Sequence, residues 1–481
     1  MRIAIIGAGV SGLCAAMQLK RAGIDSFTVY ERSEAVGGTW HDNIYPGCAC
    51  DTPSHLYSYS FEPNPDWSRI WAEQPEIEAY FNRCADKYGL RPHIRFRTPI
   101  ASARFEETSK LWRLTLASGE EETADILISG LGQLNVPAFP DIPGMVTFAG
   151  TSFHSARWDA THDLAGKDVA VIGNGASATQ FIPRIAPLVK SLTIFQRSPN
   201  WIGPKEDAEY TQEQKQTFAR SPLRRKLHRL MIFLRFEWLF GSFFKGSILR
   251  PKLETQLTIF MKHHIKDKAL RAKLTPDYPA GCKRILLSYD YYPALALPNV
   301  EVVTEPIGHI DASGIVTSDG TARTFDTIIY GTGFKSTQFL SPVEITGLGG
   351  VSLNEAWRGG AEAHRGVAVA GFPNFFMLYG PNTNLGHASI IYMVEAQVRY
   401  VLRCLGHMAR KRLRYIDVRQ DVMARYNRRL QRQLKDLVWD ANCGSWYKTS
   451  TGKITNNWPR FAFQYALGMR YPRWREYDLR G

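Results

Sequence analysis

The chain has 481 residues, enough for two or three domains that each have a hydrophobic core. Hydrophobic residues make up 44% and charged residues 22% of the sequence, as in folded globular proteins, which excludes a disordered chain. A formal net charge of +14 favours anionic partners such as phosphates or acidic lipids. The basic residues are scattered and no nucleic-acid motif is present, so we expect no nucleic-acid partner.

The seven cysteines predict neither a disulfide framework nor a metal site. Their number is odd and their spacing is irregular. Cys48-Ala49-Cys50 has one residue between its thiols where a redox dithiol usually has two, and no Cys/His pair with zinc spacing accompanies it. The apolar start is too short for a signal peptide, and no run of about 20 apolar residues could span a membrane. We expect a cytoplasmic protein without a metal.

The first residues predict a dinucleotide-binding unit. A strand from Arg2 to Ile6 precedes the turn Gly7-Ala8-Gly9-Val10-Ser11-Gly12, a helix from Leu13 to Ala22 and a strand from Ser26 to Tyr30. Gly7 allows a tight turn, Gly9 allows the backbone to approach a pyrophosphate, and Gly12 allows close packing of helix on strand. Glu31 lies 19 residues after Gly12, the position of an acid that bonds a ribose hydroxyl.

A second unit of the same kind follows in the middle of the chain. Its strand, Asp168 to Ile172, leads into Gly173-Asn174-Gly175-Ala176-Ser177-Ala178, a helix to about Leu188 and a strand from Ser191 to Phe195. Gln196 stands where the first unit has Glu31, and Arg197 follows it. Without a carboxylate and with a guanidinium, this site favours NADPH over NADH. The alternative is that Arg197 is a solvated residue at a strand end.

Residues 205–280 are predicted to form a helical insertion rich in basic and aromatic residues. Within it, the segment 224–244 has the basic cluster Arg224-Arg225-Lys226 followed by apolar and aromatic residues. We favour an interpretation in which these apolar residues line a cavity or pack on the nucleotide domain. Peripheral contact with an anionic membrane is the alternative. Extended segments return at 300–303 and 327–330, and a helix with a broad apolar face begins at about Ala388.

Two signatures give the sequence a family resemblance. The segment from Phe148 to Asp159 resembles the fingerprint of the Baeyer–Villiger monooxygenases, which are class B flavin monooxygenases. All its fixed positions are present: Phe148, Gly150, His154, Trp158 and Asp159. A second resemblance runs from Gly37-Gly38-Thr39-Trp40 to Asp51 and on to Tyr57, and the segments 371–374 and 380–384 are similar to family segments beside the flavin. The resemblance covers residues 1–465 and is weakest in the insertion.

The resemblance implies an α/β fold of two interleaved, doubly wound Rossmann-like domains that bind FAD and NADPH, with a helical insertion. The FAD-binding domain would comprise residues 1–144 and 334–481. The NADPH-binding domain would comprise residues 145–204 and 281–333, and the insertion residues 205–280. The expected cofactor-binding residues are Gly7, Gly9, Gly12, Glu31, Gly38, Thr39, Trp40, Asp51, Tyr57, Ile100, Gly173, Gly175, Ala176, Ser177, Arg197, Ser198, Lys283 and Asn384.

The same resemblance implies a reaction. A family member uses NADPH and O₂ to form a peroxyflavin, which attacks an apolar ketone and gives an ester or lactone. Arg284 is the expected catalytic cation, oriented by Asp51, while Lys283 joins Arg197 at the NADPH 2′-phosphate. Without the motif, Arg284 would be interpreted as part of a surface ion pair. His154 is expected to have a structural or hinge role rather than to transfer protons.

Three rival functions stay open at this point. Oxygenation of sulfur or nitrogen would use the same cofactors and depend less on Arg284. Trp158 favours ketones, because the sister family that oxygenates heteroatoms more often has a smaller aromatic residue there. A disulfide reductase is disfavoured by the lack of a C-x-x-C motif, and a non-catalytic flavin protein by the presence of Asp51, Lys283 and Arg284. The sequence identifies neither the substrate nor the oligomeric state.

Overall fold

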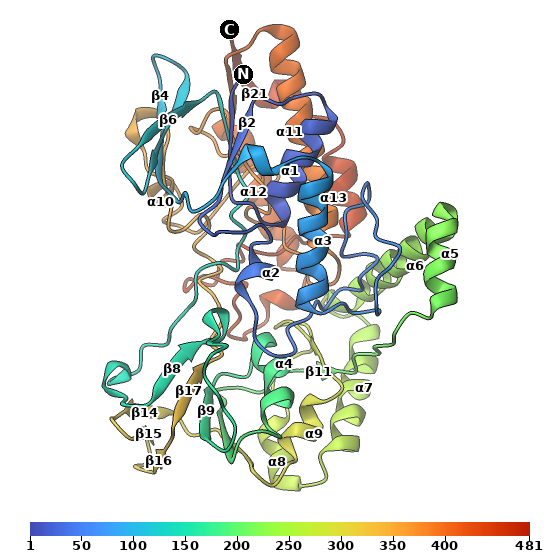
Figure 1. Cartoon of the computed structure of the whole chain (residues 1–481). Coiled ribbons are helices and arrows are strands. Elements are labelled where there is room, and N and C mark those ends of the chain that lie inside the picture. The colour runs from blue at the N-terminus through green and yellow to red at the C-terminus, as the bar shows by residue number, and fades with distance from the viewer.

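A computed structural model describes all residues, 1–481. Two five-stranded parallel sheets form the two halves of the molecule, the first in the upper half of Figure 1 and the second in the lower half. The first sheet has the order β19-β7-β1-β2-β3, with β1 (Ile3–Ile6), β2 (Phe27–Tyr30), β3 (Ile94–Arg95), β7 (Ile126–Ser129) and β19 (Phe375–Met377). All four residues of β1 are buried, as expected of a strand covered on both faces.

The second sheet repeats this arrangement. Its order is β13-β10-β9-β17-β8, with β8 (Thr151–His154), β9 (Asp168–Ile172), β10 (Ser191–Phe195), β13 (Val300–Val303) and β17 (Thr327–Tyr330). Every neighbouring pair of strands is parallel. Because β19 comes from the C-terminal part of the chain, the first sheet is completed only after the second, and the predicted α/β fold of interleaved Rossmann-like halves is confirmed.

The helices that follow the glycine turns differ slightly from their predicted bounds. α1 (Val10–Arg21) begins before Leu13 and includes Gly12, and α4 (Ala176–Ile185) ends before Leu188. α11 (Ile390–Lys411) begins after Ala388, because the Ser389 hydroxyl accepts the Ile391 N–H and caps the helix. Its apolar face packs against α1 and α13 (Ala462–Gly468).

Residues of the predicted insertion form mostly helices. These are α5 (Gln212–Arg220), α6 (Pro222–Phe240), α7 (Leu249–His264) and α8 (Lys268–Leu274). α5 and α6 extend from the side of the molecule (Figure 1). No helix is long and apolar enough to cross a membrane. The predicted domain boundaries stay a prediction.

Smaller elements surround the two large sheets. A four-stranded sheet has the order β18-β4-β5-β6, and a three-stranded antiparallel sheet joins β14, β15 and β16. Their bounds, with those of the two short pairs, are β4 (Ile100–Glu106), β5 (Leu111–Leu116), β6 (Glu121–Ala124), β18 (Glu344–Thr346), β14 (Ile307–Ile310), β15 (Gly314–Thr317), β16 (Ala322–Thr324), β11 (Ile202–Gly203), β12 (Leu286–Leu287), β20 (Tyr415–Val418) and β21 (Tyr477–Arg480). The remaining helices are α2 (Thr39–Asp42), α3 (Gln74–Lys87), α9 (Tyr291–Leu295), α10 (Leu353–Ala356) and α12 (Gln420–Leu434).

Candidate active site

One cavity of about 1190 Å³ is lined by residues of both halves. It collects most of the residues that the sequence predicts to bind cofactors or to act in catalysis. Those in its lining are Gly7, Gly9, Glu31, Gly38, Thr39, Trp40, Asp51, Tyr57, Ile100, Gly173, Gly175, Ala176, Ser177, Arg197, Ser198, Lys283, Arg284 and Asn384. A cavity of this size, with polar groups converging from several elements, has the form of a small-molecule site.

Gly12 is the one predicted cofactor-binding residue outside the lining, and packing explains its position. A Cβ at Gly12 would lie 1.8 Å from the Gly7 carbonyl oxygen, so only glycine lets α1 approach the turn. Gly9 precedes α1 as its N-cap and offers no capping side chain, and a Cβ on Gly38 would lie 2.9 Å from the Gly9 Cα. The free N–H groups and the bare backbone suit a pyrophosphate at this end of α1.

The carboxylate of Glu31 is buried and fixed by the backbone. Its Oε2 accepts the Ala8 N–H at 2.6 Å and its Oε1 accepts the Ser33 N–H at 2.8 Å. These bonds place a negative charge at the end of β2, beside the first glycine turn, where a ribose hydroxyl could donate to it. The first turn therefore fits the adenosine half of FAD.

The second turn is neutral where the first is acidic. Gln196 accepts from the Asn174 side-chain amide at 2.8 Å and donates to the Lys273 carbonyl at 2.7 Å. Lys283 donates to the Ser198 hydroxyl at 2.7 Å and lies 4.4 Å from the Tyr278 ring centroid. Burial, and then repulsion by the Arg197 guanidinium, lower the pKa of Lys283. An anion between these two cations would relieve their repulsion, which fits the 2′-phosphate of NADPH.

Arg284 and Asp51 meet at the cavity from positions distant in the sequence. The Arg284 Nε donates to Asp51 Oδ2 at 2.7 Å, and its Nη1 lies 3.5 Å from the Leu385 carbonyl oxygen. Burial lowers the pKa of Arg284, but the Asp51 carboxylate and the Tyr447 hydroxyl outweigh burial and hold the pKa above its usual value. The site thus contains a permanently charged cation in a fixed orientation.

The Cys48-Ala49-Cys50 segment lies in the cavity wall but lacks reactive thiols. Burial raises the pKa of Cys48 to about 12 and raises that of Cys50 further. Thiols are nucleophilic as thiolates, so these two cysteines are poorly suited to redox catalysis.

The residues of the Phe148–Asp159 segment lie outside the cavity lining and shape β8 and the turn after it. Gly150 accommodates the Phe148 ring, which a Cβ would meet at 2.6 Å. Trp158 packs on Phe181 of α4, with ring centroids 5.3 Å apart, and Asp159 accepts the Thr161 N–H at 2.9 Å.

His154 occupies the buried end of β8. Its Nδ1 accepts the Ala156 N–H at 3.0 Å, and burial lowers its pKa to about 4, so the ring is neutral near pH 7. It packs between Phe139 and Phe334, where the chain passes between the two halves. This surrounding favours a structural or hinge role, which stays a proposal.

Several residues in the lining were not among the predicted cofactor-binding residues. Gly130 follows β7 and lies against Gly7, and Gly331 follows β17 and lies against Gly173. Gln180 of α4 accepts the Tyr45 hydroxyl at 2.9 Å and donates to the Ala49 carbonyl at 2.9 Å, joining the two halves. The glycines carried a signal, because each follows an apolar strand. Gln180 carried none, and neither did Trp446, which also lines the cavity.

Comparison with known proteins agrees with this geometry. The family model described as flavin-binding monooxygenase-like matches residues 1–342. A Baeyer–Villiger monooxygenase of Pseudomonas aeruginosa is 45% identical over 468 residues, covering 96% of this chain and 88% of that protein. One of Streptomyces coelicolor is 44% identical, covering 100% of this chain and 92% of that protein.

The chain belongs to the flavin-binding monooxygenase family, among its Baeyer–Villiger members.

Solved structures of this family share the whole fold. The crystal structure of OTEMO in complex with FAD and NADP matches with a TM-score of 0.91 at 29% identity, covering 100% of this chain and 99% of that one. Cyclohexanone monooxygenase from a Rhodococcus species, bound to NADP⁺, matches with a TM-score of 0.90 at 27% identity, again covering 100% and 99%. As a family member, the protein is an FAD-containing, NADPH-dependent monooxygenase of the Baeyer–Villiger type.

Proposed function

We propose that the protein inserts an oxygen atom beside the carbonyl of an apolar ketone, at the point in the cavity where Arg284 and Asp51 meet. The observation that carries this proposal is their ion pair, formed by residues 233 positions apart in a cavity that also contains both glycine turns. When bound, FAD supplies the activation of O₂ and NADPH supplies the electrons. The chain itself supplies position, charge and exclusion of water.

We assign to Arg284 the stabilisation of negative charge on the reacting oxygen atoms. Its guanidinium stays protonated because Asp51 and Tyr447 raise its pKa despite burial. A cation already fixed in place stabilises developing charge without reorganisation during the reaction. Asp51 is a positioning residue in this proposal, since its Oδ2 contacts both Nε, at 2.7 Å, and Nη2, at 2.5 Å, and so fixes the orientation of the guanidinium.

We assign nucleotide selection to Arg197, Ser198 and Lys283. Two cations and a hydroxyl group surround the position where a 2′-phosphate would lie, and Gln196 adds no negative charge. Bidentate binding of a phosphate oxygen pair suits a guanidinium, and a lysine adds a point charge. The arrangement supports NADPH as the electron donor.

The test is product analysis with the purified yellow enzyme, NADPH, ¹⁸O-labelled O₂ and a panel of ketones and thioethers. We expect a labelled ester or lactone. Arg284→Ala should reduce its formation about 10²- to 10³-fold, the usual cost of removing one charge-stabilising donor. Arg284→Lys is the matched control, because it keeps a charge but loses the geometry of the Asp51 pair. Sulfoxide as the only oxygenated product, unaffected by Arg284→Ala, would overturn the proposal in favour of heteroatom oxygenation.

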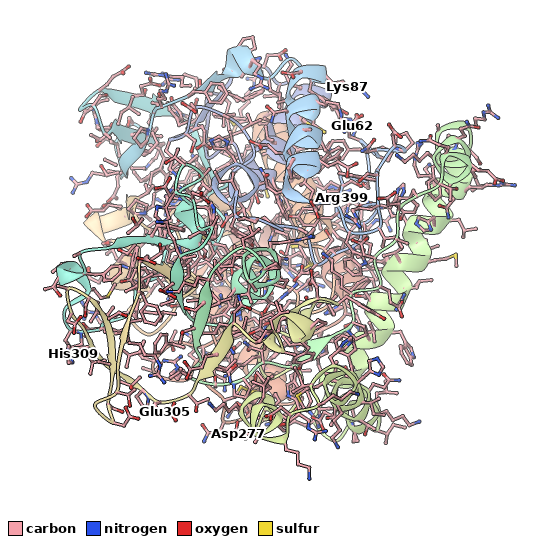
Figure 2. The ribbon with its side chains drawn as sticks, turned by 60° about the horizontal axis from the view of Figure 1, so that its bottom comes forward. Glu62, Lys87, Asp277, Glu305, His309 and Arg399 are labelled. Carbon is pink, nitrogen blue, oxygen red and sulfur yellow. A yellow bond between two sulfur atoms is a disulfide. The ribbon has the colours of Figure 1, made fainter.

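A stripe of exposed apolar residues on α6 supports a second proposal, contact of a cytoplasmic enzyme with an anionic membrane. The stripe consists of Leu223, Leu227, Leu230, Met231, Leu234 and Trp238, each exposed by 48% to 76%. At 100° per residue they share one face, so the favoured prediction that this segment's apolar residues are covered does not hold for them. In Figure 2 the green helices of this region lie at the edge of the molecule.

The charges beside the stripe favour lipid over a second copy of the chain. Arg224, Lys226 and Arg235 are exposed at its borders, and two copies packed stripe to stripe would bring these cations together. An anionic bilayer would attract the same cations and accept the apolar side chains at its interface. Near its C-terminal end α6 packs inward through Phe240 and through Glu237, which pairs with His387 at 3.0 Å. Ala388, next to His387, lines the cavity, so the helix lies between the cavity wall and the proposed membrane.

Vesicle sedimentation tests the membrane proposal. At low salt we expect sedimentation with phosphatidylglycerol vesicles but not with phosphatidylcholine vesicles, and partial release at high salt. Leu230→Glu combined with Leu234→Glu should abolish it. A matched control, Gln212→Glu combined with Gln256→Glu, adds the same charge outside the stripe and should retain most binding. Absence of binding at low salt, or a concentration-dependent dimer that the first pair of substitutions dissociates, would contradict the proposal.

A further inference from the structure

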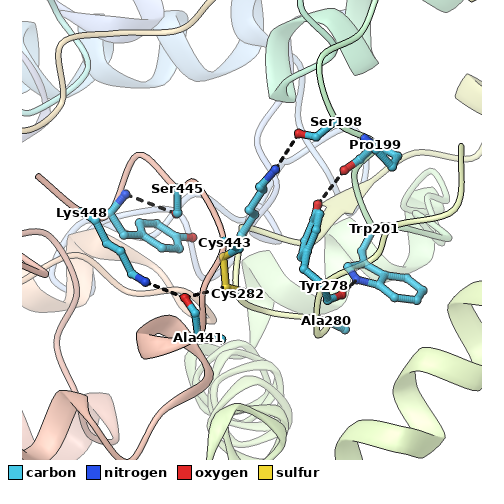
Figure 3. Close-up of a disulfide and its surroundings, with 12 residues drawn as sticks. Ser198, Pro199, Trp201, Tyr278, Ala280, Cys282, Ala441, Cys443, Ser445 and Lys448 are labelled. Atoms are coloured by element: carbon cyan, nitrogen blue, oxygen red, sulfur yellow. Dashed lines mark hydrogen bonds between the residues drawn. A yellow bond between two sulfur atoms is a disulfide. The ribbon is translucent and has the colours of Figure 1, made fainter. Parts of the chain in front are cut away.

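Cys282 and Cys443 form a disulfide at the edge of the cavity, a pairing that the sequence did not predict. Their Cα atoms are 6.5 Å apart, within the range that a disulfide spans, and 161 positions separate them in the chain. Figure 3 shows the two cysteines between the segment that leads to Ser198 and the segment that leads to Lys448. The disulfide therefore links covalently two parts of the chain that otherwise make only non-covalent contacts.

Each cysteine is followed at once by residues of the cavity lining. Lys283 and Arg284 follow Cys282, and Gly444, Ser445 and Trp446 follow Cys443. The crosslink thus connects the segment that contains Lys283 and Arg284 to the segment 444–446 of the cavity lining. Breaking this bond would therefore affect cavity-lining residues directly, because each cysteine is adjacent in the chain to one of them.

The two walls differ in how firmly the rest of the protein holds them. Cys282 is fully buried, and a Cβ at the preceding Gly281 would lie 3.0 Å from the Phe243 ring, so this wall is tightly packed. On the other side Cys443 is partly exposed. The 443–446 wall packs on the buried Tyr447 cluster, and the Ser336 hydroxyl donates to the Trp446 carbonyl at 3.0 Å. The crosslink is the covalent attachment of the less firmly held wall.

In the reduced form, the Cys282 thiol would have a hydrogen-bond acceptor nearby. The Cys282 Sγ lies 3.7 Å from the Ala441 carbonyl oxygen, a distance at which a thiol donates a weak hydrogen bond. The same carbonyl accepts from Lys448 Nζ at 2.6 Å, so this oxygen is bonded whether or not the thiol is present. The other five cysteines are buried and unpaired, which confines disulfide chemistry to this pair.

We propose that the Cys282–Cys443 pair is a redox switch on nucleotide binding: the crosslinked form holds the 443–446 wall against the Lys283–Arg284 wall, and reduction loosens it. This inference rests on the proposed NADPH site at Arg197 and Lys283. The oxidant is hydrogen peroxide. One thiol attacks peroxide, giving a sulfenic acid and water; the second thiol attacks that sulfur, forming the S–S bond and releasing a second water. A dithiol donor reverses the change, taking up the bond as its own disulfide.

In the reduced form, nucleotide binding must also order the 443–446 wall, which costs conformational free energy. In the crosslinked form this wall is already ordered. Because immobilising a side chain on binding costs free energy, NADP⁺ should bind roughly three- to tenfold more tightly to the crosslinked enzyme. Amide hydrogen exchange of peptides covering residues 441–448 should also be faster after reduction.

The experiment compares FAD-loaded enzyme treated with hydrogen peroxide or with dithiothreitol. Alkylation and peptide mass spectrometry report the crosslink, and titration calorimetry reports NADP⁺ affinity without any need for ketone turnover. Wild type and the control Cys404→Ser, which removes a thiol outside the cavity, should show the three- to tenfold difference. Cys443→Ser and Cys282→Ser should bind like the reduced enzyme under both treatments, with bound FAD confirming that they fold.

Two outcomes would overturn the switch. One is that peroxide gives no Cys282–Cys443 crosslink. The other is that crosslinked and reduced enzymes bind NADP⁺ equally and exchange amides in 441–448 at the same rate, in which case the bond is structural only. Failure of NADP⁺ to bind in either form would instead overturn the proposed nucleotide site, and the switch with it.

Discussion

The two glycine turns of this enzyme have the same backbone arrangement but differ in the charge of the side chains beside them. In the first, β1, α1 and β2 end at a buried carboxylate, Glu31, that the backbone holds through two N–H groups. In the second, β9, α4 and β10 end at the neutral Gln196, beside Arg197 and Lys283. The backbone suits a pyrophosphate in both turns, and we propose that one or two side chains at the end of the second strand decide which nucleotide fits.

The two turns also differ in how tightly the helix packs against the turn. The third position is Gly12 in the first unit and Ala178 in the second. The second turn accommodates the methyl group of Ala178, whereas a Cβ at Gly12 would lie 1.8 Å from the Gly7 carbonyl oxygen.

The largest expected effect is that of Gly12→Ala on FAD binding, because it introduces into the first turn the methyl group that the second turn has at Ala178. The added methyl would lie 1.8 Å from the Gly7 carbonyl oxygen, so the backbone must shift, at a cost near or above about 3 kcal/mol. We expect loss of bound FAD, read from the absorbance of the purified protein. Gly175→Ala is the control, because its nearest contact would be 3.9 Å away and FAD should be retained. Full FAD occupancy in Gly12→Ala would show that the two turns pack alike.

Removing the charge in the first turn should be the next largest effect. Glu31→Gln replaces a carboxylate that accepts two N–H groups, and hydrogen bonds to charged groups contribute about 1.5–3 kcal/mol. We expect FAD to bind about 10- to 100-fold more weakly, measured by fluorescence as the apoenzyme is titrated. NADP⁺ affinity should change little. A parallel loss of both cofactors would indicate general unfolding rather than a site in the first turn.

Removing the guanidinium in the second turn should weaken discrimination between nucleotides. Arg197→Ala should raise the KM for NADPH about 10- to 100-fold and leave that for NADH nearly unchanged, because only NADPH has the 2′-phosphate. Steady-state rates with each nucleotide measure this, and Arg184→Ala on α4, whose residue is absent from the cavity lining, is the control. An equal rise for both nucleotides would place Arg197 elsewhere than at the 2′-phosphate.

The smallest expected effect is a pH dependence of the same discrimination. Burial and Arg197 lower the pKa of free Lys283 below 10.5, and a bound phosphate should raise it again. The contribution of Lys283 to binding is therefore complete below the pKa of the free enzyme and is lost as pH rises through the pKa of the complex. We expect NADP⁺ affinity to fall as pH rises above the lowered pKa of free Lys283, while NAD⁺ affinity does not. Lys283→Arg should flatten the profile; an unchanged slope in that variant would exclude Lys283 as its source.

Much of the fold could be predicted because its signals are local. Each βαβ unit is contiguous, and its apolar strand, glycine turn and amphipathic helix are all visible within about 30 residues. The fold class was confirmed for this reason. Helix ends were predicted less well, since α1 begins inside the glycine turn and α4 ends at Ile185.

The remaining features depend on partners far away in the sequence. Arg284 and Asp51 were paired through the family resemblance, because nothing in their local sequence indicates the contact. Cys282 and Cys443 were not paired, because cysteine spacing is informative only within short frameworks. On α6, composition could not distinguish the exposed Leu230 from the buried Phe240; only the position of the helix against the cavity wall does so.

The position of β19 at the edge of the first sheet has a consequence for synthesis on the ribosome. β1, β2, β3 and β7 emerge early, but β19 pairs with β7 only after the whole second sheet has been translated. The second half can fold as soon as β17 is available, whereas the first waits, with one edge of its sheet open, for residues 375–377. An open parallel edge is a site for aggregation, so the nascent chain depends on the second half folding promptly and on the C-terminal part following it.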